Sequence, residues 1–403
     1  MTKSALEIPE GYEGREQAWI KHTLLKTYLE KLLLIVGIGG RRAGEIELCY
    51  VDCFAGPWGD ESDQLDGTSI AISLRTMEQC RRVLQGFNVR ATMRALYVER
   101  DDAAFDQLRE YLARDRADRI DAHCMHGDFV DLRDEILNWC GRRAFTFFFI
   151  DPKGWKPVAV SLLQPLLARP GSEFLINFMY DFINRTASMQ ALKHDMAEFL
   201  GCDIDALNRL SGSTPEARES FLVKTYRDGL RAACEAGGSV DRARTAHVRI
   251  MDPGRDRPKY HLVYLTSHPK GVVKFMEISE GLDVVQQRVG ASKRNARRQD
   301  SSGTADLFGA ASYEAATPPA HEVQPHEVDA FWLQYLTAGP KRIGEAEMAE
   351  LLEDTGWMPK DFQASLVRLI ASGDVRNLDA IKLRRSRPLH YEQAGERLEL
   401  VPV

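Results

Sequence analysis

The chain has 403 residues, of which 44% are hydrophobic and 28% are charged. These fractions are typical of a folded globular protein and exclude a disordered, collagen-like or coiled-coil chain. The net charge of -6 excludes a histone-like polycation, so a nucleic-acid partner has to bind a local basic patch. The length favours one large domain with a smaller one, or two comparable domains.

Membrane, secretory and metal signals are absent from the sequence. The longest apolar stretches, such as residues 32–36 and 147–150, are far shorter than the roughly 20 residues that span a bilayer. Residues 1–19 are polar and acidic, unlike a secretory signal. The seven cysteines are odd in number and scattered, so we interpret them as reduced thiols of a cytoplasmic protein. Only Cys49 and Cys53 are close together, and we expect no metal site because no second pair lies at zinc-ligand spacing.

Strand-like and helix-like segments alternate along the first half of the chain. An amphipathic helix is predicted at residues 17–36. Strand-like runs follow at 47–54, 91–99, 121–129, 144–151 and 172–180, with helix-like segments at 67–82, 101–115, 129–140 and 158–168. The run 144–151 is apolar almost throughout, as in a strand covered on both faces of a parallel sheet. The order predicts a doubly wound α/β fold.

A helical insertion interrupts this alternation at residues 182–238. Ser213 or Thr214 is expected to cap the helix that begins at Pro215. Beyond the insertion, strand-like runs at 243–251 and 259–267 flank a turn-forming segment, which predicts an antiparallel hairpin that adds a reversed strand to the sheet. We interpret the insertion as a lid or substrate platform.

The composition changes at residues 285–326, which are poor in large apolar residues and rich in Ser, Gly, Ala and Pro. We predict a linker there, between a large domain at 1–284 and a small α+β domain at 327–403. In the small domain, three helix-like segments precede two strand candidates, which is the order of a winged helix. The basic residues where its wing would lie are Arg376, Lys382, Arg384, Arg385 and Arg387. Basic wings contact phosphates, although exposed arginines are also common on solvated hairpins, and we expect Arg384 and Arg385 to bind substrate.

Acidic residues end four successive strand candidates of the large domain: Asp52, Glu99, Asp128 and Asp151. The carboxyl ends of parallel strands meet at one edge of the sheet, where doubly wound folds bind nucleotides. One such acid alone is more often a solvated turn residue or a helix cap. The four together predict a nucleotide-type site.

The residues around these acids suit such a ligand. Ala55 and Gly56 are small, so a ligand can approach the backbone after the first strand. Glu99 is placed to accept hydrogen bonds from ribose hydroxyls, and Asp128 from an adenine amine. Phe129 is placed to pack on the adenine ring.

These motifs resemble the class I S-adenosylmethionine-dependent methyltransferases, especially those acting on the exocyclic amine of adenine. Asp52, Phe54, Ala55 and Gly56 match their D-x-F-A-G-x-x-G cofactor loop, with Pro57 and Trp58 stretching the usual spacing to Gly59. The resemblance implies S-adenosylmethionine as cofactor, with Glu99 on its ribose and Asp128 on its adenine.

The first helix carries a second resemblance. Its Lys21-His22-Thr23-Leu24-Leu25 resembles the K-H-T-x-L element of a bacterial ribosomal RNA adenine methyltransferase. In that protein the element helps close the cofactor site, which implies cofactor binding by Lys21 and His22.

A broader resemblance covers most of residues 15–285 and is to the three-Cys-motif partner proteins. It rests on the ordered set IKHTLLKTYLEKLL, YVDCFAGPWGD, GTSIAI, FFFIDPKGW, LINFMYDFINR and YHLVYLTSHPKG. This bacterial family is usually encoded beside a protein with three cysteines in a radical-type iron-sulfur motif. The resemblance implies such an iron-sulfur protein as partner.

The fourth strand end departs from the adenine amine methyltransferases. Those enzymes carry D/N-P-P-F/Y, in which the acid and a backbone carbonyl accept hydrogen bonds from the target amine and the aromatic ring stacks on a flipped base. This chain has Asp151-Pro152-Lys153-Gly154-Trp155. We expect Asp151, Pro152 and Lys153 at the reaction centre, with Trp155 supplying the ring. Tyr180, after the fifth strand, is expected to touch substrate or to cap the next helix.

Two functions remain open. The first is a methyltransferase acting on nucleic acid, DNA or RNA, or on a nucleobase. The second is a catalytically silent adaptor of the same fold that docks the iron-sulfur protein, DNA or both. The four strand-end acids favour the first function, and the altered Asp151-Pro152-Lys153-Gly154 sequence favours the second.

Overall fold

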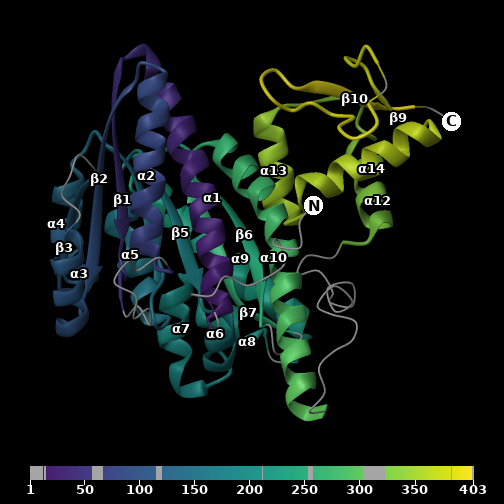
Figure 1. The fold of residues 1–403 in the computed structure, drawn as a ribbon. Helices are drawn as coiled ribbons and strands as arrows, with labels where there is room; N and C mark the ends of the chain where they lie inside the picture. Colours follow the sequence, from purple (N-terminus) through teal and green to yellow (C-terminus); the bar gives the residue numbers. More distant parts are fainter. Residues whose placement is uncertain are drawn as a thin grey trace.

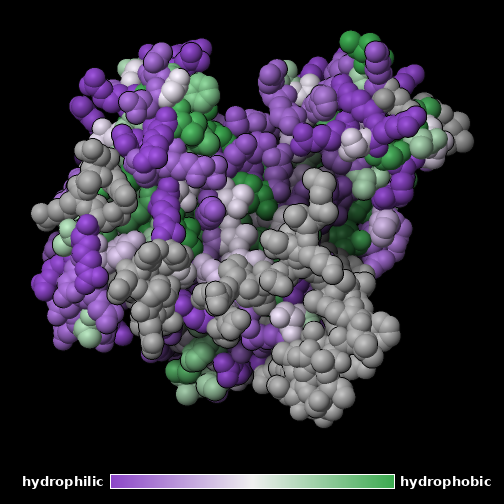
Figure 2. Space-filling model, in the orientation of Figure 1, coloured by the Kyte–Doolittle hydropathy of each residue, from purple (hydrophilic) through white to green (hydrophobic). Residues whose placement is uncertain are grey.

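The computed structural model describes residues 12, 15–56, 67–114, 120–210, 212–252, 257–302, 323–382 and 384–401. They form a seven-stranded sheet covered by helices on both faces, and a smaller domain with a three-stranded sheet (Figure 1). Within this described part of the chain, none of the helices combines the length and apolarity that a bilayer span requires. In Figure 2 the visible described surface is mostly hydrophilic, with hydrophobic residues in small separate groups.

The large sheet has the strand order β3-β2-β1-β4-β5-β7-β6. The strands β1 to β5 are parallel to one another, and β7 runs antiparallel to both β5 and β6. The strands are β1 (Glu45–Asp52), β2 (Arg90–Glu99), β3 (Asp121–His126), β4 (Phe145–Ile150), β5 (Ser172–Phe178), β6 (Arg244–Met251) and β7 (Pro258–Thr266). The predicted α/β alternation and the reversed strand of the closing hairpin are therefore confirmed.

Helices cover both faces of the sheet and enclose separate apolar cores. One core lies under α1 (Glu16–Gly39), α2 (Ser69–Gly86), α3 (Asp102–Arg114) and the first part of α10 (Pro269–Ser302). The other lies under α4 (Arg133–Cys140), α5 (Val160–Leu167) and the insertion helices. The fourth strand is buried on both faces, as its continuous apolar sequence predicts.

The predicted insertion is helical and begins directly after β5. It comprises α6 (Tyr180–Thr186), α7 (Lys193–Leu200), α8 (Ile204–Asn208) and α9 (Pro215–Ala236). Pro215 occupies the first turn of α9, and the Thr214 hydroxyl accepts a hydrogen bond from the Ala217 amide at 3.2 Å. Of the two predicted caps, Thr214 is the one observed.

The predicted linker starts too early, because α10 continues without a break to Ser302. Val289 is fully buried in the first core, and with Leu282 and Val285 it recurs at helical spacing. A few apolar residues therefore suffice to hold this helix against α1. The linker is thus wrong for residues 285–302, and residues 303–322 lie outside the described residues.

The small domain has the element order α12, β8, α13, α14, β9, β10. These are α12 (Pro325–Tyr335), β8 (Lys341–Ile343), α13 (Glu345–Thr355), α14 (Pro359–Ser372), β9 (Val375–Asn377) and β10 (Glu396–Leu400). The three predicted helices and the last strand are confirmed. The first strand candidate, around residues 376–383, is a strand only at its start, because β9 ends at Asn377. The sequence did not indicate β8, whose three residues include one apolar side chain, Ile343, and which pairs antiparallel with β10.

The two domains pack directly against each other. Helix α10 contacts α13 and α14, and one apolar core continues from the large sheet into the small domain. Arg244 on β6 and Glu353 on α13 form a buried ion pair at 2.7 Å. A second oxygen of Glu353 accepts from the Thr245 amide at 2.8 Å. The small domain is therefore fixed to the large one and is not a tethered appendage.

Candidate active site

A cavity of about 1280 Å³ opens at the carboxyl ends of the parallel strands. Elements β1 to β5 each contribute their last residues or the loop that follows, and α1, α6 and the start of β7 close the sides. Most of the predicted site residues line it, namely Lys21, Phe54, Gly56, Glu99, Asp128, Phe129, Asp151, Pro152 and Lys153. The residues predicted at the strand ends therefore surround one cavity.

Asp52 lies behind the cavity wall and holds the loop that follows β1. Its carboxylate is fully buried and accepts hydrogen bonds from the Phe54 amide at 3.2 Å and the Ser69 hydroxyl at 2.7 Å. Burial raises the pKa of this carboxyl to about 7. Ala55 is also buried, and its amide donates to the Val98 carbonyl at 2.8 Å. Both residues therefore support the loop from below, and neither lines the cavity.

Glu99 and Gly56 face each other across the cavity floor. One Glu99 oxygen accepts hydrogen bonds from the amides of Arg100 and Asp101, both at 2.7 Å. The other oxygen points toward Gly56, where a side-chain β-carbon would overlap it. The absence of a side chain at Gly56 is what leaves this carboxylate oxygen open to a ligand.

Asp128 and Phe129 form the wall after β3. One oxygen of Asp128 accepts from the Val130 amide at 2.9 Å, and the other from the Arg100 guanidinium at 3.3 Å. The Phe129 ring lies 5.2 Å from that of Phe54. The two rings add to an apolar surface to which Val98 and Met179 also contribute.

Asp151 is the centre of a polar cluster at the end of β4. It forms an ion pair with Lys21 of α1, and it accepts a hydrogen bond from the Asn177 amide nitrogen at 2.6 Å. Lys21 also lies 5.7 Å from the centre of the Tyr260 ring. The lysine of the K-H-T-x-L element thus points at the predicted reaction centre.

His22 takes a different position from its neighbour. It is buried, and its Nδ1 lies 3.0 Å from the Tyr12 hydroxyl. Burial, aided by the adjacent Lys21, lowers the pKa of His22 to about 3, so the imidazole is neutral at physiological pH. The His22 side chain is on α1 but does not line the cavity.

Trp155 and Tyr180 belong to the core. The Trp155 indole is buried edge-on against Phe199 at 5.2 Å, within an aromatic group that includes Phe178 and Tyr226. The prediction that Trp155 supplies a ring at the reaction centre is therefore wrong, because the insertion helices provide an apolar site that buries it. Tyr180 is the first residue of α6 and packs edge-on against His261 at 5.6 Å, away from the cavity lining.

Many lining residues were not predicted from the sequence, Asn177 and Phe182 among them. Asn177 on β5 is buried, and Phe182 on α6 is exposed. Asn177 is a polar residue inside the apolar run LINFMY, and that interruption near a strand end was the available signal. No sequence signal indicated Phe182, because its position in the sequence matches that of a core residue of a helix.

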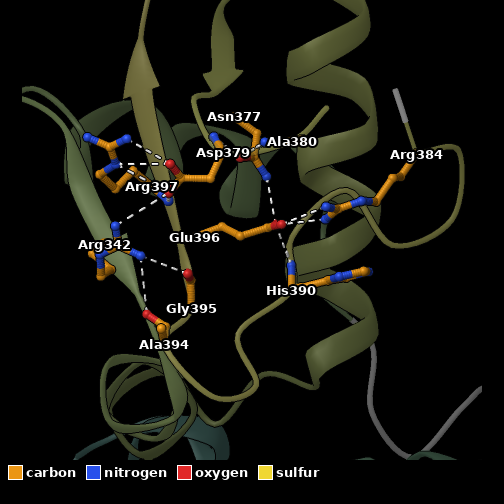
Figure 3. A network of polar contacts seen from close by, with 10 residues as sticks. All are labelled: Arg342, Asn377, Asp379, Ala380, Arg384, His390, Ala394, Gly395, Glu396 and Arg397. Atoms are coloured by element: carbon orange, nitrogen blue, oxygen red, sulfur yellow. Dashed lines mark hydrogen bonds and ion pairs between the residues drawn. The ribbon is translucent and has the colours of Figure 1, made fainter. Parts of the chain in front are cut away.

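The basic residues of the C-terminal domain are largely paired with acids. Arg384 makes a bidentate ion pair with Glu396 at 2.7 and 2.6 Å, and Glu396 also accepts from Asn377 and the His390 amide (Figure 3). Arg376 pairs with Glu399. Arg385 is exposed and lines a groove beside α14. Neither Arg384 nor Arg385 lies at the strand-end cavity.

Metal and disulfide chemistry find no support in the described residues. They contain no group of three or more His, Cys, Asp or Glu side chains arranged to hold a metal. All seven cysteines fall within them, and none forms a disulfide.

Comparison with known proteins places the chain among no established family. No protein-family model matches it, and no curated protein does. Among solved structures, a Legionella pneumophila protein of the DUF519 family aligns over 67% of this chain and 91% of its own, with 9% identity and a TM-score of 0.37.

Two O-methyltransferases are also similar to the chain. One, from Bacillus cereus and solved with SAH, covers 59% of this chain and 80% of its own at 11% identity and a TM-score of 0.28. The other, TomG from Streptomyces achromogenes with SAM, covers 66% and 93% at 11% identity and a TM-score of 0.31. TM-scores this low carry no argument about this chain. Its assignment to a Rossmann-like, methyltransferase-like α/β fold rests on its own strand order, in which a reversed β7 lies between β5 and β6.

Proposed function

We propose that this protein is an S-adenosylmethionine-dependent methyltransferase that acts on nucleic acid or a nucleobase. The observation that carries the proposal is the cavity itself. One cavity brings together an open Glu99 oxygen over a side-chain-free Gly56, the Asp128 carboxylate, and the Asp151 cluster. The Glu99 oxygen and the Asp128 carboxylate suit the ribose and adenine of a nucleoside, and the Asp151 cluster suits a reacting nucleophile.

The lining residues have separate roles in cofactor binding and in methyl transfer. Glu99 and Asp128 would hold the nucleoside part of the cofactor, and Phe54 and Phe129 would pack beside it. When bound, the cofactor supplies a methyl group on a positively charged sulfur. Asp151 orients the acceptor atom and takes the proton that this atom loses. Lys21 holds the Asp151 carboxylate in place from α1.

Calorimetric titration with S-adenosylmethionine tests the proposal first. Saturable binding supports the enzyme, and no detectable heat at millimolar cofactor contradicts it. Asp151→Ala then separates the roles, because it should leave cofactor affinity within about twofold while abolishing turnover. Equal loss of both would make Asp151 a cofactor or structural residue.

One observation favours the alternative, a catalytically silent adaptor. Asp151 is already paired with the ammonium of Lys21 before any acceptor binds. Calorimetry distinguishes the two functions, since an adaptor has no need of the cofactor.

The partner proposal rests on the ordered sequence resemblance to the three-Cys-motif partner proteins. We infer that an iron-sulfur protein with three motif cysteines works with this chain in the cytoplasm, where the seven unpaired cysteines stay reduced. Co-expression and co-purification of the two proteins test this inference. Separate elution of the two proteins on gel filtration contradicts it.

We also propose that the C-terminal domain is a winged helix that contacts nucleic-acid phosphates. Its element order, α12-β8-α13-α14-β9-β10, and the exposed cations Lys382 and Arg385 in the loop between β9 and β10 support this. An electrophoretic shift assay across salt concentrations tests it, because phosphate contacts weaken steeply as salt rises. Lys382→Glu with Arg385→Glu should lower affinity and the salt slope, and salt-insensitive binding would contradict the proposal.

A further inference from the structure

The end of β4 provides fewer acceptor-recognition groups than adenine amine chemistry requires. Asp151 is present, but Lys153 and Gly154 stand where the second proline and the aromatic residue would be. Trp155 is buried against Phe199. A second hydrogen-bond acceptor and a stacking ring therefore have to come from elsewhere if the cavity receives a base.

Asn177 provides a second acceptor directly beside Asp151. Its side chain is 5% exposed and lines the cavity. The amide nitrogen has to face Asp151, because a carboxylate accepts hydrogen bonds and cannot donate them. This orientation leaves the Asn177 Oδ1 buried without a partner among the described residues. A buried acceptor without a donor is destabilising, so this oxygen points to the N–H of a ligand.

Phe182 provides a ring on the next element. It lies on α6, lines the same cavity and is 45% exposed, which is unusual for a large aromatic side chain. The Arg185 guanidinium lies 5.4 Å from the ring centre. An exposed aromatic ring beside an arginine is the surface on which unstacked bases pack.

We propose that residues 177–185 form an acceptor-recognition segment for a planar heterocycle that carries an exocyclic amine. The amine donates one N–H to Asp151 and the other to Asn177 Oδ1, while the ring stacks on Phe182. Two acceptors side by side match an amine and repel a carbonyl at the same position, so the segment selects adenine over hypoxanthine. The role of this base as methyl acceptor rests on the proposed function, whereas its recognition does not.

Fluorescence anisotropy with a matched pair of probes tests the proposal. Single-stranded hexanucleotides carry one adenine among thymines, or one hypoxanthine at the same position, in deoxy and ribo forms. The full-length protein should bind the adenine probe at least tenfold more tightly. Asn177→Leu, which keeps the volume and removes the amide, should abolish this preference. Phe182→Ala should weaken binding of both probes about tenfold, and Phe182→Tyr should restore it.

A control variant and a second measurement make failure interpretable. Phe87 is 46% exposed and follows α2 at the opposite edge of the sheet, so Phe87→Ala should bind both probes like wild type. Calorimetry with S-adenosylhomocysteine reports the cofactor site of every variant separately. Equal affinity for the two probes, or an unchanged preference in Asn177→Leu, overturns the recognition segment even if S-adenosylhomocysteine binds. Adenine preference without S-adenosylhomocysteine binding supports the segment and overturns methyl transfer alone.

Discussion

Gly56 controls access to the predicted ribose-binding oxygen of Glu99. A β-carbon at this position would overlap the Glu99 carboxylate, which the amides of Arg100 and Asp101 hold in place. We expect Gly56→Ala to reduce S-adenosylmethionine affinity at least tenfold, because the loop or the carboxylate has to move. Overpacking should also lower the free energy of unfolding by about 1–3 kcal/mol.

Gly154 offers a control in the same cavity. A β-carbon there has no neighbour within 4 Å. Gly154→Ala should therefore bind S-adenosylmethionine like wild type in the same calorimetric titration. Wild-type affinity in Gly56→Ala would show that the cofactor does not lie against Glu99.

The buried Asp52 makes stability depend on pH. Its folded pKa of about 7 lies above the unfolded value of about 3.9, so the folded state binds the extra proton between these values. The associated stability is fully present below about pH 4 and is lost as the pH rises through about 7. From pH 5 to pH 8, wild type should lose about 2 kcal/mol of unfolding free energy relative to Asp52→Asn. Urea titrations at the two pH values measure this, and parallel stability profiles would contradict it.

At the residue scale, the sequence predicted the strand-end acids because a fixed relation joins a strand end to the sheet edge. Glu99, Asp128 and Asp151 follow that relation and reach the cavity. Asn177 obeys it too, but one polar residue in an apolar run resembles ordinary strand alternation. The position of the Trp155 side chain depends on its packing against Phe199, which is distant in sequence. This tertiary contact could not be predicted from the local sequence.

At the element scale, α10 makes residues 285–302 part of the folded structure. Gln287 lies in the helix interior, between the buried Gln286 and Val289. Gln287→Pro should lower the free energy of unfolding by about 3 kcal/mol, because proline removes a hydrogen bond and clashes with the preceding turn. Gln287→Ala should leave stability near wild type. A proline tolerated at this position would restore the linker predicted from composition.

The helix at residues 285–302 was predicted to be a linker because of its composition, and the error has a physical reason. Residues 285–302 are rich in small and basic side chains, which resemble a solvated linker when read alone. Val289 nonetheless completes a core to which α1 and β6 already contribute, so little apolar surface per residue is needed. The strand β8 was missed for a similar reason, because its pairing with β10 is long-range.

At the scale of the whole molecule, the two domains are held by a buried ion pair. Arg244 and Glu353 are both nearly inaccessible to solvent. Glu353→Ala removes the partner at 2.7 Å from the buried Arg244 and leaves it only Glu350, at 3.8 Å, which should cost about 3 kcal/mol of unfolding free energy. We also expect limited proteolysis to release the C-terminal domain faster than in wild type.

Glu350 is the matched control on the same helix. It pairs with Arg242 at the surface at 2.7 Å, where both side chains are about half exposed, and it makes only a longer contact of 3.8 Å with Arg244. Glu350→Ala should cost less than about 1 kcal/mol. Equal losses from the two substitutions, measured by urea unfolding, would show that the buried pair does not hold the domains together.

The unbroken helix α10 also fixes the distance between the C-terminal domain and the strand-end cavity. At Glu277 it accepts a hydrogen bond from Tyr391 of the C-terminal domain, and at Lys293 it reaches the strand-end cavity. At 1.5 Å per residue these points are about 24 Å apart along one rigid axis. A polynucleotide held by both domains at once would have to bridge that gap, which corresponds to about seven stacked nucleotides at 3.4 Å each. Shorter oligonucleotides would then engage one end only, so affinity should rise stepwise with oligonucleotide length.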